Sequence, residues 1–437
     1  MGAATTRCVR LPMNRTATTP HQLTRLQLAV YSLGALAMNL ANLVLTEWFY
    51  ERYVVGGVIS TVAFSIIILA GRITDGISDP FLAYWTDNTR SRWGRRIPFL
   101  LFGTLPFAIV SFLLWVPPQG ASDVFRIGYA TVLAQAYFLL YGLVVTPYLA
   151  LLPEIAGSSS DRLNLTTGQG VAALVGTLCF AFAGLIVQYF GFVGLGVMVG
   201  LAILISYYPI PFVISESEHA AGAKPSLKML FQWIREVIGN MTFLPLLIST
   251  SLYWFALNLL LMLVPRWVQV QLGMEKDAVT WLMLPFIAVN LIAFFIFNWI
   301  AKRFGKYRSF LLVFALTVLV FGLVGFSDRI QIGLSQFTVA QCIVGLAGVP
   351  VGGFGVLAFA LLAEVIDEDS NRRGLHREAI FFGVQAIFQK SMIGLSAVAF
   401  GWLQTFGSSQ SFHGCAFLAA AICLAGLFAF ARFPIRN

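Results

Sequence analysis

The sequence predicts an all-α membrane protein that crosses the bilayer with twelve helices, and three observations support this fold class. Of the 437 residues, 58% are hydrophobic and 11% are charged, and so little charge does not cover the surface of a soluble protein of this length. The hydrophobic residues form blocks of about 20, the length that spans ~30 Å of hydrocarbon as a helix. The Lys and Arg residues lie mostly between these blocks, where a membrane protein carries them.

Twelve such blocks follow one another along the chain. In lipid, every backbone N–H and C=O must be bonded within its own segment, so blocks of this length form helices. The strands of a membrane barrel would be shorter and would alternate apolar with polar residues, which these blocks do not. The expected helices cover residues 26–50, 54–86, 97–116, 124–152, 165–190, 192–214, 242–270, 278–301, 309–326, 337–363, 379–405 and 414–433.

The longest polar gap divides these blocks into two groups of six. Residues 215–240 are rich in charged side chains, and we expect a cytoplasmic linker with a short amphipathic helix there. Residues 1–25 are polar and basic, without the apolar core of a signal peptide, and indicate a cytoplasmic N-terminal tail. The N-terminal six-helix half then spans 26–214, and the C-terminal half spans 241–437.

The basic residues predict the orientation of the chain. If both termini are cytoplasmic, most Lys and Arg residues fall in cytoplasmic segments, including four arginines between residues 90 and 96. Such a bias is typical of cytoplasmic loops. The sequence therefore favours a multi-pass protein of the plasma (inner) membrane with an even number of helices and both termini in the cytoplasm.

Composition argues against several classes of function. The net charge of +9 comes from the loop residues, and no nucleic-acid-binding motif accompanies it, so we expect no nucleic-acid partner. The five Cys and four His residues lack the spacing of a metal site. The sequence shows no nucleophile–base pair that would indicate an enzyme and no filter sequence that would indicate a channel. We expect a monomer in the lipid bilayer that has no cofactor.

A short repeat indicates how the two halves are related. The basic–aromatic–Gly–basic tetrapeptide at 92–95 follows the second block, and a similar one at 303–306 follows the second block of the second half. Six-helix halves related by an axis along the membrane normal are the major facilitator architecture, in which the halves rock around a site at the midplane. The sequence therefore predicts the major facilitator fold, with twelve transmembrane helices in two six-helix halves.

The second block carries charges deep within its apolar stretch. Arg72, Asp75 and Asp79 lie at positions i, i+3 and i+7, on one stripe of the helix, and Pro80 follows. A charge inside a membrane helix is costly unless it is paired or hydrated. Two carboxylates one turn apart repel each other, and a bound cation such as Na⁺ would relieve that repulsion. We interpret Asp75 and Asp79 as a cation site, with a structural Arg–Asp pair as the alternative.

Lys390 is the only other charge that the sequence places fully within the membrane. It lies about 18 Å from the cytoplasmic end of the eleventh block at 1.5 Å per residue, near the depth of Asp75. In a protein of two halves, the second and eleventh blocks would face each other. We expect Lys390 to pair with Asp75 and Asp79 when the cation site is empty and to be released when a cation binds. The alternative is a lysine that extends to the membrane surface.

The loop after the second block has two possible roles. Its charged residues could form ion pairs with the mixed-charge loop before the eleventh block and hold a cytoplasmic gate shut. They could equally serve as an anchor that sets the orientation of the chain. The gate residues would be Asp87, Arg92 and Arg95.

Polar residues within the blocks are candidates for contact with a substrate. Amide and hydroxyl side chains are rare in these apolar segments, and each could instead donate a hydrogen bond between helices. The candidates are Asn39, Tyr148, Gln385 and Gln389.

These segments resemble the glycoside–pentoside–hexuronide:cation symporter family, the melibiose permease-like members of the major facilitator superfamily. The likeness extends from the first block to the eleventh, and the Asp-x-x-x-Asp-Pro stretch is its most specific part. It is carried by Arg72, Asp75, Asp79-Pro80, the stretch 87–95, Pro147-Tyr148, Ala363-Glu364 with Asp367, and Val384-Gln385 with Lys390.

The resemblance implies coupling to Na⁺, Li⁺ or H⁺, with Asp75 and Asp79 as cation ligands and with Arg72 and Lys390 at the coupling interface. At the positions where the family has its sugar-binding and cation-supporting polar residues, this sequence has Asn39, Gly142, Val145, Gln169-Gly170 and Gly355. The predicted function is symport of a small organic solute, by class a sugar or glycoside, with a cation. The alternatives are an amphiphilic, lysophospholipid-type substrate and a non-transporting membrane protein.

Overall fold

The computed structural model describes most of the chain, over residues 23–156, 159–214, 234–331, 333–373 and 378–434. The predicted N-terminal tail over 1–25 lies almost wholly outside these ranges. Most of the predicted linker over 215–240 also lies outside them. The division of the chain into a tail, two halves and a linker therefore stays a prediction.

The first half of the described chain forms six long helices with short extensions. These helices satisfy their own backbone groups, as apolar segments must in lipid. They are α1 (Arg25–Tyr50), continued by the π-helical turn η1 (Glu51–Val55), α2 (Thr61–Asn88), α3 (Ile97–Leu113), α4 (Asp123–Ile155), α5 (Ser159–Ala181), α6 (Ala183–Tyr207) and the short α7 (Ile210–Val213).

The second half of the described chain also contains six long helices. They are α9 (Phe243–Arg266) with its π-helical extension η2 (Trp267–Gln271), α10 (Ala278–Phe304), α11 (Lys306–Gly325) followed by η3 (Ser327–Arg329), α12 (Gln336–Arg373), α13 (Glu378–Leu403) followed by η4 (Gln404–Phe406), and α14 (Ser408–Phe430). Ten helical segments of the described chain are long and apolar enough to span a membrane. The other two are α3, which has only 17 residues, and α5, which begins with a polar stretch. The predicted all-α membrane fold of twelve helices is confirmed.

The boundary between the fifth and sixth predicted helices falls on Gly191. The sequence predicts helices over 165–190 and 192–214, whereas the continuous stretch α6 runs through this boundary. Gly191 has φ 66° and ψ −172°, which is not a helical conformation. Glycine adopts such a positive φ without steric cost because it lacks a Cβ atom. The stretch α6 is therefore two helices joined at Gly191, where the sequence places the boundary.

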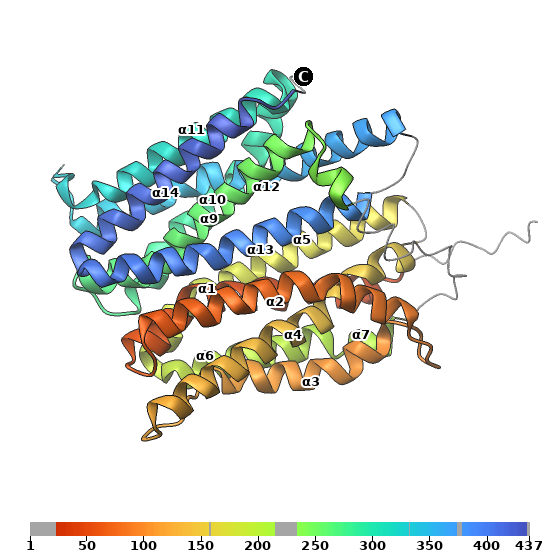
Figure 1. Ribbon diagram of the computed structural model, residues 1–437, viewed down its shortest axis with the longest axis horizontal. Coiled ribbons are helices and arrows are strands. Elements are labelled where there is room, and N and C mark those ends of the chain that lie inside the picture. Colours follow the sequence, from red (N-terminus) through yellow and green to blue (C-terminus); the bar gives the residue numbers. More distant parts are fainter. Residues whose placement is uncertain (1–22, 157–158, 215–233, 332, 374–377, 435–437) are drawn as a thin grey trace, which may run out of the picture.

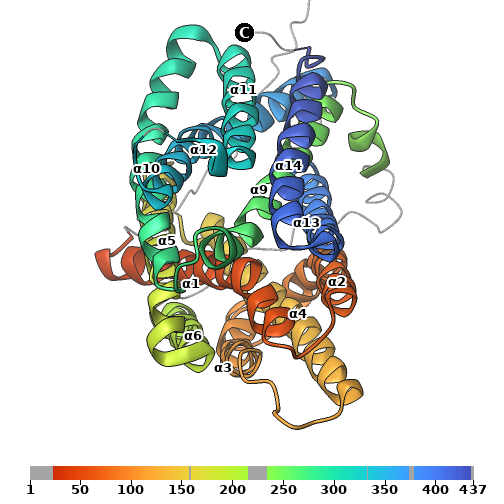
Figure 2. The same cartoon turned by 90° about the vertical axis from the view of Figure 1, so that its left-hand side faces the viewer.

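The helices lie side by side along the long axis of the molecule (Figure 1). Viewed from one end, α1–α6 form one group and α9–α14 another (Figure 2). Between the groups, α2 packs most extensively against α13, while α1 packs against α9 and α5 against α10. We call the end with the arginine-rich α2–α3 loop the predicted cytoplasmic end, and the opposite end the predicted external end.

Small residues allow α2 and α13 to approach closely. A Cβ atom on Gly401 would lie 2.2 Å from Ser65 Oγ, and one on Gly394 would lie 3.2 Å from Arg72 Cβ. A larger side chain at either glycine would push the two helices apart. The Ser65 hydroxyl donates a hydrogen bond of 3.5 Å to the Ala397 carbonyl of α13. This contact brings the charged residues of α2 within reach of α13.

A charged site between the two halves

The three central charges come from facing helices of the two halves. The ammonium nitrogen of Lys390 on α13 lies 2.6 Å from Asp79 Oδ2 and 3.0 Å from Asp75 Oδ1. The two acids are four residues apart on α2, so both point toward the same neighbour. Asp75 is 1% exposed, while Asp79 is 30% and Lys390 17% exposed. The structure thus forms the ion pairs that the sequence predicts, while their dependence on a cation stays a prediction.

The hydrogen bonds of the two acids differ. Asp79 Oδ2 accepts a hydrogen bond from Lys390, and Asp79 Oδ1 accepts one of 3.4 Å from the Thr146 hydroxyl on α4. Asp75 Oδ1 is close to Lys390, but the contact lacks hydrogen-bond geometry, so this oxygen has no donor among the described residues. Two carboxylates that share one ammonium carry a net charge of −1 when all three groups are ionised. A cation or a proton would neutralise the site.

Arg72 does not pair with the acids in the described chain. Its Nη2 atom donates to Asn42 Oδ1 at 3.1 Å and to Thr46 Oγ1 at 3.2 Å, both on α1. The guanidinium also lies 5.1 Å from the centre of the Phe138 ring on α4. The alternative of a structural Arg72–Asp75 pair is therefore wrong, because the arginine holds α2 to α1. The proposed coupling role of Arg72 stays a prediction.

Two candidate substrate contacts serve to join helices within the first half. Asn39 Nδ2 donates to the Ala173 carbonyl at 2.8 Å and to Thr177 Oγ1 at 2.6 Å, which links α1 to α5. Tyr148 is fully buried. Its hydroxyl donates to the Tyr31 carbonyl at 3.0 Å. In this conformation Tyr148 offers no accessible surface to a substrate, and contact through either residue stays a prediction.

The two candidate glutamines lie on α13, within five residues of Lys390. Gln385 is 7% exposed, and its Oε1 atom has no hydrogen-bond donor among the described residues. Gln389 is half-buried and directly precedes Lys390. A buried acceptor without a donor is costly and often marks a place where water or a ligand binds. Gln385 therefore has an unpaired acceptor, whereas the Asn39 amide and the Tyr148 hydroxyl already donate hydrogen bonds within the protein.

The predicted gate residues lie at the predicted cytoplasmic end. Arg92 is exposed, and its guanidinium lies 4.4 Å from the centre of the Trp93 ring. Arg95 is half-buried, and the side chain of Asp87 lies outside the described part. In the second repeat, Lys306 Nζ pairs with Glu364 Oε1 of α12 at 2.5 Å. The tetrapeptide therefore makes an ion pair within its own half, and gating by the first copy stays a prediction.

A second pair of buried charged residues, Glu47 and Glu51, is not among the candidates that the sequence predicts. Glu47 on α1 is 0% exposed and Glu51, one turn later, is 2% exposed. The sequence places Glu47 near the end of a block that stops at residue 50, as if close to the surface. The helix instead continues to Val55 as the π-helical turn η1, so Glu47 lies eight residues before the end of the helical stretch. The signal in the sequence is the acid itself, because a carboxylate inside an apolar block is costly unless it is paired, hydrated or protonated.

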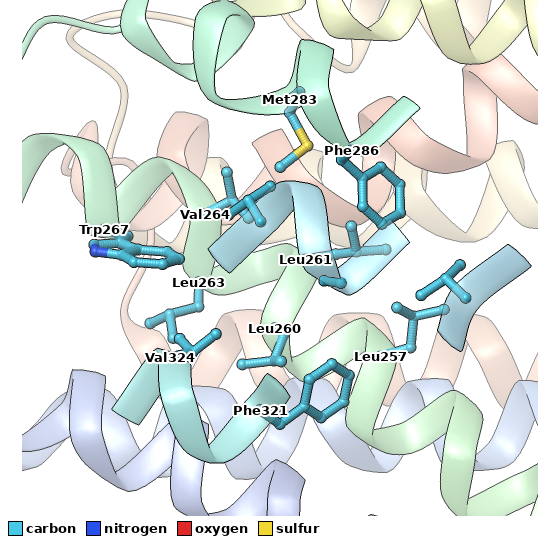
Figure 3. Close-up of a pocket in the computed structure, with 13 residues that line it drawn as sticks. Leu257, Leu260, Leu261, Leu263, Val264, Trp267, Met283, Phe286, Phe321 and Val324 are labelled. Carbon is cyan, nitrogen blue, oxygen red and sulfur yellow. The ribbon is translucent and has the colours of Figure 1, made fainter. Parts of the chain in front are cut away.

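An apolar cavity of about 60 Å³ lies within the second half, away from the ion pairs. Figure 3 shows side chains of α9, α10 and α11 that surround it, including Leu261, Met283, Phe286 and Phe321. Its lining contains no charged side chain and no amide. The cavity has room for an apolar group and offers nothing that would bind an ion.

Comparison with known proteins places this geometry in context. The chain matches a family model described as MFS/sugar transport protein over residues 30–436. The isoprimeverose transporter of Lactiplantibacillus pentosus is 24% identical over 405 residues, 88% of this chain and 80% of that protein. The sodium-dependent lysophosphatidylcholine symporter 1 of Gallus gallus is 25% identical over 399 residues, 79% of this chain and 73% of that protein.

A solved structure supports the fold. The nucleoside transporter NupG matches with a TM-score of 0.67 at 13% identity, and the match covers 94% of this chain and 100% of that one. At this identity the likeness shows the fold alone. The arrangement of two helical groups in Figure 2 is therefore shared with a known membrane transporter.

Proposed function

Because the chain belongs to the MFS/sugar transport protein family, we propose that it carries a sugar or glycoside across the membrane together with a cation. Membership makes the chain a multi-pass membrane transporter with the major facilitator fold, and not an enzyme. The substrate class, the coupling cation and the roles of single residues are the parts that we propose. The orientation, with both termini in the cytoplasm of the plasma (inner) membrane, rests on the distribution of basic residues.

One observation supports the coupling mechanism above all others: Lys390 is shared by Asp75 and Asp79 across the boundary between the halves. A lysine that neutralises one of two carboxylates leaves room for one more positive charge. When Na⁺, Li⁺ or H⁺ binds the acids, the attraction that holds Lys390 weakens. The cation therefore changes the strength of the contact between α2 and α13, which the two halves must rearrange as they rock.

The substrate class rests on different support. The family description and the isoprimeverose transporter both name sugars. Gln385, on the same helix as Lys390, has a buried oxygen without a donor among the described residues and would accept a hydrogen bond from a substrate hydroxyl. We therefore favour a sugar or glycoside bound between the halves, in contact with α13.

A second candidate substrate is an amphiphile with an acyl chain. The apolar cavity between α9, α10, α11 and α12 would accept an apolar group. The sodium-dependent lysophosphatidylcholine symporter 1 is similar over most of its length. Both candidates would use the same cation site. The second would also place its acyl chain in the apolar cavity of the second half.

Uptake into proteoliposomes tests the proposal and separates the two substrates. The purified protein is reconstituted, and labelled glycosides and lysophosphatidylcholine are each supplied with inward gradients of Na⁺, Li⁺ or H⁺. We expect one glycoside to accumulate above its external concentration and to leave again when an ionophore collapses the gradient. Accumulation of the lysolipid alone would favour the second candidate. Uptake that never exceeds equilibrium with any gradient would contradict cation coupling.

A further inference from the structure

A second pair of buried acids lies between the halves at the predicted external end. Glu47 lies three residues before the end of α1, and Glu51 begins η1 one helical turn later. Glu51 Oε2 accepts a hydrogen bond of 3.1 Å from Gln269 Nε2 of η2 in the other half. Gln269 Nε2 also donates to the Pro265 carbonyl at 3.1 Å, which fixes the amide toward the acid. Glu51 thus forms part of the contact that closes this end.

Glu47 has no partner in that contact. It is 0% exposed, and neither carboxyl oxygen has a hydrogen-bond donor among the described residues. An ionised carboxylate without donors or a counter-ion is very unfavourable in a dry interior, whereas the neutral acid is tolerated. Glu47 does not belong to the ion-pair site of Asp75 and Asp79, whose contacts lie on α13 and α4.

The charged groups around the pair agree with a neutral Glu47. Glu51, one helical turn away, repels a negative charge on Glu47. The positive charges of Arg266 on α9 and of Lys276 before α10 attract the Glu51 carboxylate. Arg52 of η1 donates instead to the Trp115 carbonyl. The helices α5, α6 and α7, which also pack on α1, carry no acidic or basic residue after position 162.

Other contacts show that this end is closed. The backbone N–H of Leu185 donates to Thr280 Oγ1 at 3.2 Å, and Gln188 Nε2 donates to Glu275 Oε2 at 2.6 Å, both between the halves. When the halves separate here, η1 leaves η2 and water reaches the acids. A hydrated Glu47 then ionises, because water solvates the carboxylate that the closed interface cannot.

We propose that Glu47 binds a proton that stabilises the closed external gate, separate from the coupling cation at Asp75 and Asp79. The gate closes with Glu47 neutral and opens as Glu47 releases its proton to the external water. This inference rests on the proposed function in one respect, that the two halves rock apart at this end. By linkage, the protonated form favours the closed state, so a higher external pH favours the open state.

Spin-label distances measure the gate directly. Labels on cysteines at Val124 and Leu334, both exposed and in different halves at this end, are introduced after the native cysteines are replaced by alanine. Pulsed electron paramagnetic resonance measures the distance between the two labels in the protein in nanodiscs. The distance distribution gives the open fraction from pH 5 to pH 9 in the absence of coupling cation and substrate. We expect the open-to-closed ratio to rise with pH, by up to about tenfold per pH unit for one linked proton.

Two variants make the test specific. Glu47→Gln keeps the shape of the neutral acid and cannot ionise, so the open fraction is expected to stay low and independent of pH. Glu275→Gln is the matched control, an exposed acid that also joins the halves at this end, and it is expected to keep the pH dependence of the parent protein. Equal pH dependence in Glu47→Gln and the parent would overturn the proposal.

A readout without a variant covers the case in which Glu47→Gln does not fold. Infrared spectra separate a neutral carboxyl group from a carboxylate, and we expect the parent protein to lose a buried carboxyl band as the open fraction rises. An unchanged spectrum while the gate opens would overturn the proton site. A gate that responds to the coupling cation but not to pH would also overturn it, and would leave the proposed function intact. A distance that neither pH nor cation changes would contradict both.

Discussion

Lys390 and Asp79, 311 positions apart in the sequence, form a hydrogen bond of 2.6 Å between the two halves of the protein. The bond joins α13 to α2, the two helices that pack most extensively between the halves. Asp75 competes for the same ammonium at 3.0 Å. The contact between the halves therefore depends on a charge balance that a single added cation would change.

Loss of either acid should remove the effect of the cation on stability. A cation at 100 times its Kd stabilises the folded protein by about 2.7 kcal/mol. We expect Asp75→Asn and Asp79→Asn each to abolish this gain, measured in detergent as the shift of Tm that the coupling cation found in the uptake assay produces. Asp123→Asn is the control, since Asp123 is exposed and pairs with Arg126 on its own helix. The same Tm shift in all three variants would contradict the site.

Removal of the lysine should separate binding from coupling. Lys390→Met leaves Asp75 and Asp79 to repel each other, so we expect cation binding to persist while accumulation of substrate is lost. The double variant Lys390→Met/Asp79→Asn removes that repulsion and should be more stable than Lys390→Met by about 1–3 kcal/mol. Chemical unfolding of the four proteins in a double-mutant cycle measures this coupling. Additive effects would show that the pair does not interact.

A hydroxyl added beside Asp79 should strengthen cation binding. A Cβ atom on Gly142 would lie 3.3 Å from Asp79 Oδ1 and 3.0 Å from Leu82 Cδ1. Gly142→Ser therefore places an oxygen near the acid with a small shift of Leu82. We expect the Kd for the cation to fall about tenfold, as for one added bond to a charged group of ~1.5 kcal/mol. Gly142→Ala adds the same Cβ atom without the oxygen, and an equal change in both variants would refute the explanation.

Close contact between α2 and α13 should be required for transport. Gly401→Leu should force α2 and α13 apart, because its Cβ atom alone would lie 2.2 Å from Ser65 Oγ and 3.4 Å from the Thr61 carbonyl oxygen. We expect uptake to fall more than tenfold while the Tm shift with the coupling cation remains, because Asp75 and Asp79 both lie on α2 and keep their spacing when α13 moves away. Gly383→Leu on the same helix is the control, since its Cβ atom would meet nothing within 4 Å. Normal uptake by Gly401→Leu would contradict a need for this closure.

Much of the fold follows from the sequence because lipid imposes a simple rule on it. Each apolar block of sufficient length must form a helix, so the twelve helices could be predicted. The break at Gly191 was equally predictable, since a glycine between two apolar blocks suits the turn that the structure has there. The contact of Lys390 with the two acids could also be predicted, because an unpaired charge at that depth is unfavourable in free energy and requires a partner.

Other parts of the site depend on geometry that a sequence pattern does not contain. The direction of Arg72, toward Asn42 and Thr46 on α1 and away from Asp75, depends on how α1 packs against α2. The burial of Glu47 depends on how α5, α6 and α9 pack against α1. A pattern of apolar residues gives the depth of a side chain along a helix and does not give its direction around the helix.

The most direct test of this account is the distance between Lys390 Nζ and Asp79 Oδ2 in a structure determined with a saturating concentration of the coupling cation found in the uptake assay. The distance is 2.6 Å in the structure described above. If the cation replaces the lysine, we expect this distance to exceed the 4.0 Å limit of an ion pair, with the cation bound between the two acids. A lysine that still contacts Asp79 while the cation occupies another place would contradict the mechanism.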